Sequence, residues 1–282
     1  MALAMPYNLF EGHLTFRRDG KNVDQELRSL CQHIKQMQIS DDLSIDFDVT
    51  SMDFDIGQGL FFESTIPQGF GVGSSGALCA ALLHRYTKED INLLLTDTNR
   101  LKVFFAKMES HFHGASSGMD PLISFINRPI LFKGKGELIE VQIPERKNKD
   151  GAALFLLNTG RARRTEPLVN LFLEKCKTSE FAKICEGELV KVTHDCINNF
   201  LEGNSRELFY SWKKLSQIQL ENLTPMIPKL YIDLWKEGLK DTRFALKLCG
   251  AGGGGFLLGM AENLDLVKKL LSSHEIRPVY FF

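Results

Sequence analysis

The sequence predicts a mixed α/β protein of the α+β type, built from two domains. Segments with strand patterning and segments with helical patterning follow one another along the whole chain. The 282 residues are 44% hydrophobic, enough for a large core in one big domain or two moderate ones. A charged, proline-bounded segment, residues 144–151, interrupts the apolar patterning. It predicts an N-terminal domain over residues 1–148 and a C-terminal domain over residues 149–282.

The first half contains segments with the hydrophobic periodicity of strands and segments with that of helices. Alternating or short apolar runs predict strands at residues 8–18, 44–51, 59–64, 129–133 and 138–143. Apolar residues at helical spacing predict helices at residues 22–37, 74–86 and 89–112. A strand that leads through a glycine-rich loop into a helix, as residues 59–86 do, is the context that a phosphate-binding loop requires.

The second half predicts a different order of elements. Strands are expected at residues 152–157, 244–248, 256–260 and 276–281. Three or four helices are expected over residues 166–240, with an interruption at 222–228, and another at 264–271. A β-α-β-β-α-β order favours a helix-backed, mainly antiparallel sheet of the ferredoxin-like type, here with extra helices.

Charge and cysteine content restrict the classes of function to be expected. The formal net charge is -1, and no long run of one sign suggests a nucleic-acid stripe or a basic membrane patch. No run of about 18 apolar residues occurs, and the six cysteines form no C-x-x-C pair. We expect a cytoplasmic protein with reduced thiols that acts on a small molecule, with no nucleic-acid or membrane partner.

The stretch PQGFGVGSSGA at residues 67–77 is the first candidate site. Glycines let a polyphosphate lie against the backbone, and the helix that follows presents unpaired N–H groups and the positive end of its dipole. The residues expected to hold phosphate are Gly69, Gly71, Gly73, Ser74, Ser75 and Gly76. The alternative is an ordinary serine-capped helix after a glycine turn.

Glu109 and Asp120 are the second candidate site. They flank a glycine- and serine-rich turn, so both carboxylates could converge on one cleft, where one would hold Mg²⁺ and the other would orient a substrate hydroxyl. The alternative is a solvated helix end and a capping aspartate.

Two further segments could contact a ligand. Five glycines occur among residues 250–255, a density that ordinary turns do not need, and they suggest a loop that approaches a ligand closely. A flexible hairpin is the alternative. Thr165 follows Arg161, Arg163 and Arg164 after a buried strand, which suits recognition of an anion. A solvated basic loop, with Thr165 as a helix cap, explains it equally well.

The three segments PQGFGVGSSGA, HFHGASSGMD and KLCGAGGGG together resemble the motifs of the GHMP small-molecule kinases, in the right order. The resemblance covers about residues 2–260, and the second segment is most similar to the mevalonate kinases. It implies a two-domain kinase that binds ATP between its domains and phosphorylates an alcohol, with mevalonate as the first candidate. A homodimer is compatible with it. The alternatives are another GHMP kinase, for a sugar or for phosphomevalonate, and a non-catalytic nucleotide- or metabolite-binding homologue.

The resemblance also implies roles for single residues. Ser75 and Glu109 would bind Mg²⁺, and Asp120 would act as the base or orienter for the attacking hydroxyl. Thr165 would lie near Asp120 and the substrate. The second glycine loop, through Gly250, Gly252 and Gly253, would close around the phosphates.

The chain departs from the family pattern at its beginning. A strand with a catalytic lysine should precede a segment like MALAMPY, and it is absent. We expect that the given chain lacks its native beginning; the alternative is a protein that has lost the strand and the lysine.

Overall fold

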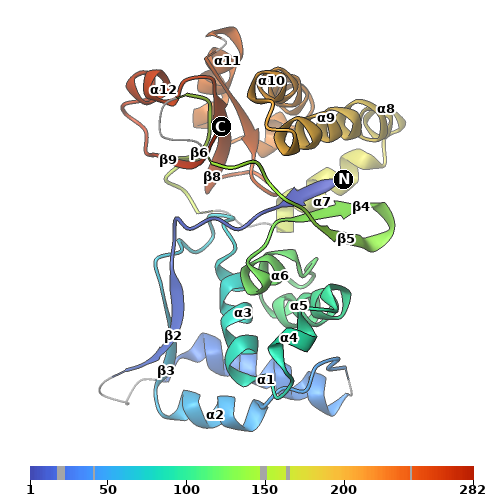
Figure 1. Cartoon of the computed structure of the whole chain (residues 1–282), viewed down its shortest axis with the longest axis vertical. Coiled ribbons are helices and arrows are strands. Elements are labelled where there is room, and N and C mark those ends of the chain that lie inside the picture. The colour runs from blue at the N-terminus through green and yellow to red at the C-terminus, as the bar shows by residue number, and fades with distance from the viewer. Residues whose placement is uncertain (18–22, 41, 147–150, 163–165, 242) are drawn as a thin grey trace.

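The computed structural model describes residues 1–17, 23–40, 42–146, 151–162, 166–241 and 243–282. The helices of the first half and a β-hairpin form one end of the molecule, and a four-stranded sheet with its helices forms the other (Figure 1). A small three-stranded sheet, in the order β1-β4-β5, lies between these ends. None of the described helices is long and apolar enough to cross a membrane.

The first half alternates strands and helices in the following order. The elements are β1 (Ala2–Ala4), β2 (Gly12–Phe16), α1 (Gln25–Ile39), α2 (Val49–Gly57), β3 (Leu60–Ser64), α3 (Ser74–Tyr86), α4 (Ile91–Leu94), α5 (Thr98–His113), α6 (Met119–Ile126), β4 (Ile130–Lys133), η1 (Gly134–Gly136) and β5 (Glu137–Glu140). Strands β2 and β3 pair antiparallel as a hairpin, and β4 pairs antiparallel with both β1 and β5.

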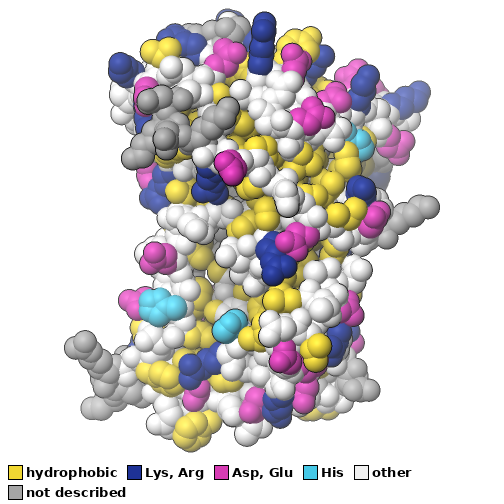
Figure 2. Space-filling model, viewed as in Figure 1, with side chains coloured by type: hydrophobic (Ala, Val, Ile, Leu, Met, Phe, Trp, Pro, Cys, Tyr) yellow, Lys and Arg dark blue, Asp and Glu magenta, His cyan; other side chains and the backbone are white. Residues whose placement is uncertain are grey.

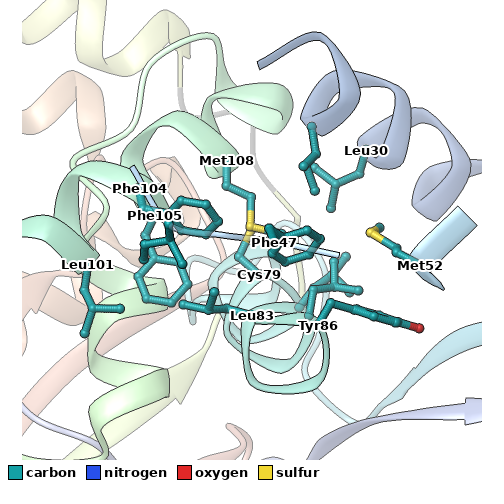
Figure 3. Close-up of a cluster of buried hydrophobic side chains, with 14 of the residues drawn as sticks. Leu30, Phe47, Met52, Cys79, Leu83, Tyr86, Leu101, Phe104, Phe105 and Met108 are labelled. Atoms are coloured by element: carbon teal, nitrogen blue, oxygen red, sulfur yellow. The ribbon is translucent and has the colours of Figure 1, made fainter. Parts of the chain in front are cut away.

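Helix α3 runs through the core of the first half. Its Cys79 and Leu83 face Phe104 and Phe105 of α5, and Phe47 lies beside them (Figure 3). All five side chains are at most 1% exposed. Burying a side chain of this size stabilises the fold by about 1.5–3 kcal/mol. Helix α3 is therefore held firmly in the core, and the position of its first turn is fixed with it.

The prediction of a strand at residues 44–51 is wrong. Ile45, Phe47 and Val49 are buried as their alternation predicts, but the segment makes only an isolated bridge between Phe47 and Thr87. Asp48 then accepts a hydrogen bond from the Ser51 N–H at 3.0 Å and starts α2. The alternation reflects the burial of a short extended segment that leads into α2, and the capping Asp48 ends this segment.

The single helix expected at residues 89–112 is divided in two. Asp90 caps α4, and Asp97 caps α5 by accepting from the Arg100 N–H at 2.9 Å. Between them the Thr96 hydroxyl donates to the Leu93 carbonyl at 2.7 Å. Side chains that bond to the local backbone compete with a continuous helix, and here they break it.

The second half contains one sheet and the helices that cover it. The elements are β6 (Ala153–Asn158), α7 (Glu166–Cys176), α8 (Ser179–Ile184), a π-helix η2 (Cys185–Leu189), α9 (Val190–Leu201), α10 (Ser205–Asn222), η3 (Thr224–Met226), η4 (Lys229–Tyr231), α11 (Ile232–Asp241), β7 (Phe244–Leu248), β8 (Phe256–Ala261), α12 (Leu264–Leu270) and β9 (Ile276–Phe281). Residues 166–241 thus hold five α-helices, where three or four were expected, because the π-helix η2 separates α8 from α9.

The four-stranded sheet is antiparallel throughout, in the order β7-β8-β6-β9. This is the order of the ferredoxin-like arrangement that the sequence predicts. Trp235 of α11 and Val267 of α12 pack on one face of the sheet. Cys196 of α9 and Trp212 of α10 pack on the other. The α+β fold class is confirmed, while the boundary near residue 148 stays a prediction because residues 147–150 lie outside the described residues.

Candidate active site

The first glycine stretch forms a loop that ends at the start of α3. Gly69, Gly71 and Gly73 have φ angles of 76°, 70° and 77°, a region that glycine adopts without strain. Because Gly73 is the N-cap residue, it offers no side chain to cap α3. The N–H groups of Ser74 and Ser75 belong to the first turn, which has no intrahelical acceptors. The loop and the helix start form an anion-binding geometry.

Glu109, on α5, lies beside this helix start. The Ser75 hydroxyl donates to Oε1 of Glu109 at 2.8 Å, and the Ser116 hydroxyl donates to Oε2 at 2.5 Å. The Ser116 oxygen in turn accepts from the Gly118 N–H at 3.0 Å. Glu109 is only 4% exposed. Its carboxylate is therefore buried and held by hydroxyl groups from two segments.

Asp120 lies in the first turn of α6, which packs tightly against α3. A Cβ atom on Gly76 would lie 2.7 Å from the Pro121 nitrogen and 2.8 Å from Cβ of Asp120, so only glycine fits there. A Cβ atom on Gly73 would lie 3.7 Å from Oδ2 of Asp120. Both predicted carboxylates thus lie at the start of α3, as the sequence reasoning expected.

The second glycine loop contacts the first. The Phe256 N–H donates to the Phe70 carbonyl at 3.3 Å, and the Phe70 and Phe256 rings lie 5.7 Å apart. Gly255 has a φ of 69°, and a Cβ atom there would clash with the Phe70 carbonyl oxygen. The glycine at this position permits the close approach of the two loops.

Gly250, Gly252 and Gly253 also have positive φ angles. The Gly253 N–H donates to the Met226 carbonyl at 2.5 Å, and the Gly252 N–H donates to the Cys249 carbonyl at 3.3 Å. These two N–H groups are satisfied within the chain. The contact of the three glycines with nucleotide phosphates stays a prediction.

Thr165 lies outside the described residues, together with Arg163 and Arg164. Of the same segment, Arg161 is described: its side chain is exposed, and its carbonyl accepts from the Gly255 N–H at 2.6 Å. The segment after β6 therefore begins against the second glycine loop. The catalytic role of Thr165 stays a prediction.

A cavity of about 670 Å³ lies next to Asp120. Gly71 and Gly73 line it on the side of the first glycine loop, residues 2–8 line another side, and side chains of α9 and α10 close it. Figure 2 shows hydrophobic side chains on the surface across the middle of the molecule, between the two ends. The cavity is large enough for a small organic substrate beside the anion-binding loop.

Tyr7 and Lys247 line this cavity and were not found by sequence reasoning. The Tyr7 hydroxyl donates to the Val72 carbonyl at 3.4 Å. Burial raises the pKa of Tyr7 above its ordinary value, and the nearby Cys249 and Asp120 raise it further. Lys247 is the first residue of the quoted segment KLCGAGGGG, three positions before Gly250, and offered a weak signal. Tyr7 has no local pattern that could have identified it.

The donor set at Glu109 fits a magnesium ion that arrives with a nucleotide. Among the described residues, no group of three or more His, Cys, Asp or Glu side chains could hold a metal. Mg²⁺ in phosphoryl-transfer sites takes one or two carboxylates, phosphate oxygens and water rather than a protein cage. One buried carboxylate with the Ser75 hydroxyl beside it, next to an anion-binding helix start, meets that requirement.

Comparisons with known proteins give one family match, over part of the chain. Residues 23–128 match the family described as GHMP kinases N terminal domain. No curated protein sequence matches the chain significantly. Solved structures share the fold at low identity.

Three of these structures cover most of both chains. The L. major mevalonate kinase in complex with R-mevalonate is 18% identical, with a TM-score of 0.59, over 95% of this chain and 85% of its own. The Streptococcus pneumoniae phosphomevalonate kinase in complex with phosphomevalonate and AMPPNP is 15% identical, with a TM-score of 0.60, over 96% and 90%. The Lactococcus lactis galactokinase complexed with galactose is 13% identical, with a TM-score of 0.57, over 96% and 85%.

Proposed function

On the premise that residues 23–128 form a GHMP kinase N-terminal domain, we propose that the chain is an ATP- and Mg²⁺-dependent kinase that phosphorylates a small alcohol. Mevalonate is the first candidate acceptor, with 5-phosphomevalonate as the product. The observation that carries the proposal is the convergence of Glu109 and Asp120 at the start of α3, beside the cavity. A protein that only binds a nucleotide has no need for a second carboxylate at the acceptor cavity.

The side chains divide the chemistry between them. The first glycine loop and the N–H groups of α3 bind the phosphates. Glu109 and Ser75 would hold Mg²⁺, which would supply positive charge to the transferred group. Asp120 accepts a hydrogen bond from the acceptor hydroxyl and orients its oxygen, and it takes the proton as that oxygen bonds to the γ-phosphorus and the bond from this phosphorus to the leaving ADP oxygen breaks. The chain has no lysine of the G-K-[ST] type after the glycines, so the helix dipole and the metal carry most of the electrostatic stabilisation.

The lining of the cavity favours mevalonate over a sugar. Aliphatic and aromatic side chains form most of it, including Leu154, Leu156, Ile197 and Phe200. A sugar exposes a hydroxyl on nearly every carbon and would lose hydrogen bonds to water against such walls. The methyl and methylene groups of mevalonate gain from the same contact.

A panel of acceptors tests the proposal. Purified chain is incubated with ATP, Mg²⁺ and either mevalonate, phosphomevalonate, galactose or homoserine, and ADP release is measured together with the phosphorylated product. We expect turnover with mevalonate and its loss when Mg²⁺ is chelated. ATP binding without phosphate transfer to any alcohol would support a non-catalytic binding protein instead.

A further inference from the structure

Lys247 occupies a position in β7 where an apolar side chain is expected. Leu246 and Leu248 point to the face of the sheet that carries the Trp235 core. Ala245 points to the opposite face, under α9 and α10, and is fully buried there. By alternation Lys247 shares that face, and its ammonium lies 5.7 Å from the centre of the Trp212 ring. The charged group of Lys247 therefore lies on the face of the sheet that α9 and α10 cover.

The ammonium group of Lys247 has no acidic partner among the described residues. Its Nζ donates to the Leu248 carbonyl at 3.0 Å, and the Trp212 ring offers a cation–π contact. An ammonium carries three donor hydrogens, so two remain for other acceptors. A half-buried charge without a counter-ion is unfavourable, and an anionic ligand would relieve that cost.

The group faces the cavity that Asp120 also lines. Among the described residues of that lining, Asp120 and Lys247 are the only charged side chains. The walls are otherwise mainly apolar, and a single charge in a cleft with low-dielectric walls acts strongly on a ligand. The cavity therefore offers one acidic group for a hydroxyl and one basic group for an anion.

We propose that Lys247 binds the anionic group of the acceptor alcohol and selects acidic alcohols over neutral ones. The inference rests on the proposed function: Asp120 orients the hydroxyl of the acceptor alcohol, and Lys247 would bind the anionic group at the other end of the same acceptor. A carboxylate and a phosphomonoester share the required chemistry. Neutral polyols offer nothing to the ammonium.

The test compares Lys247→Met with a matched control, Lys236→Met, whose lysine is exposed on α11 and pairs with Asp233. The acceptors are mevalonate, phosphomevalonate and 3-methylpentane-1,3,5-triol, the neutral analogue in which the mevalonate carboxylate is reduced. We expect Lys247→Met to raise the KM of the preferred anionic acceptor about 10- to 100-fold, the usual effect of losing a hydrogen bond to a charged group. The KM of ATP and the KM of the triol should change little, and Lys236→Met should behave as wild type.

The two acidic acceptors distinguish the source of the anion. Phosphomevalonate carries the mevalonate carboxylate as well as a phosphate, so a loss shared by both acids assigns Lys247 to the carboxylate, and a loss confined to phosphomevalonate assigns it to the phosphate. A Lys247→Met variant with unchanged KM values for both acids overturns the inference while leaving the kinase activity established. Absence of turnover by the wild type with every alcohol would instead overturn the proposed function.

Thermal unfolding without acceptor separates recognition from structure. Because Lys247 has no carboxylate partner among the described residues, its replacement by methionine should leave Tm equal or higher. A large fall in Tm would contradict a recognition role. If the methionine variant does not fold, Lys247→Gln, which keeps a polar end, is measured in its place, and acceptor binding is followed by calorimetry in the presence of a non-hydrolysable ATP analogue. Equal mevalonate affinity in wild type and variant would overturn the inference.

Discussion

Both carboxylate oxygens of Glu109 accept hydrogen bonds from serine hydroxyls, and the side chain is almost fully buried. A carboxylate in this setting is oriented before any ligand arrives. Such preorganisation costs no rearrangement during phosphoryl transfer.

Glu109→Gln should keep the shape of the site and remove its negative charge. We expect kcat to fall by about 100-fold or more, the usual effect of losing one electrostatic group at a reacting centre, and the Mg²⁺ concentration for half-maximal rate to rise. Steady-state rates measured across a Mg²⁺ titration check this. The control is Glu63→Gln, since the Glu63 side chain is 61% exposed and pairs with His13 on the hairpin. A Mg²⁺ dependence equal to that of wild type would remove Glu109 from metal binding.

Some residues of the site could be predicted from sequence and others could not. Ser75, Glu109 and Asp120 stand in short segments whose spacing carries the resemblance. Tyr7, in the segment after β1, and Lys247, in β7, reach the same cavity only when the two halves of the chain pack, so their role depends on tertiary structure.

At the level of elements, the close packing of α3 on α6 places the site. Gly76 makes this contact possible, because a Cβ atom there would meet the backbone of α6. Gly57, at the end of α2, is the opposite case: a Cβ atom there meets nothing within 4 Å.

These two glycines give a matched pair of substitutions. Gly76→Ala should lower the free energy of unfolding by about 1–3 kcal/mol, as overpacking does. Gly57→Ala should leave it unchanged or raise it by up to about 1 kcal/mol, because alanine restricts the unfolded chain. Urea unfolding of both variants measures the difference. Equal stability of the two would contradict the close contact between α3 and α6.

Glu89 joins the segment before α2 to α5. Its carboxylate accepts from the Asp46 N–H at 2.8 Å and from two Arg100 nitrogens at 2.7 and 2.6 Å. The Arg100 guanidinium lowers the pKa of Glu89 below its ordinary value, with help from the Asp46 N–H. These contacts fix the residues around α4.

Because the pKa of Glu89 is lower in the folded state than in the unfolded state, its contribution to stability decreases as the pH falls. The unfolded chain binds a proton at Glu89 more readily, so this contribution is present above the ordinary glutamate value of 4.5 and is lost as pH falls through the lower folded value. Glu89→Gln should therefore reduce the loss of stability as the pH falls below the ordinary glutamate value of 4.5. Denaturant titrations at several pH values follow it. An unchanged acid profile in the variant would show that this ion pair contributes nothing.

The elements that sequence reasoning missed have local causes. The alternation of Ile45, Phe47 and Val49 correctly reports burial, but alternation alone does not show that a partner strand is present. The break between α4 and α5 comes from Thr96 and Asp97, whose side chains bond to the backbone. Strands predicted from a continuous apolar run, such as β6, were placed to within a residue or two.

At the scale of the whole molecule, two glycine loops from different halves of the chain meet. The contact runs from Phe70 to Gly255 and Phe256. Its existence could not be derived from periodicity or composition, since it depends on how the two halves pack. The order of motifs suggested it only through the family resemblance. The cavity beside the loops is likewise a product of packing between residues 2–8, α6 and the helices of the second half.

The central claim is that Asp120 directs an alcohol at this junction toward a phosphoryl group held by the first glycine loop. The most direct measurement is single-turnover transfer of the γ-phosphoryl group of ATP to mevalonate, by wild type, Asp120→Asn and the control Asp265→Asn, whose aspartate is exposed on α12. Losing a general base costs about 100- to 10,000-fold, so we expect transfer by Asp120→Asn to slow by that factor while its ATP affinity stays within a few-fold of wild type. The control should match wild type. Transfer by Asp120→Asn at a near-normal rate would contradict the claim.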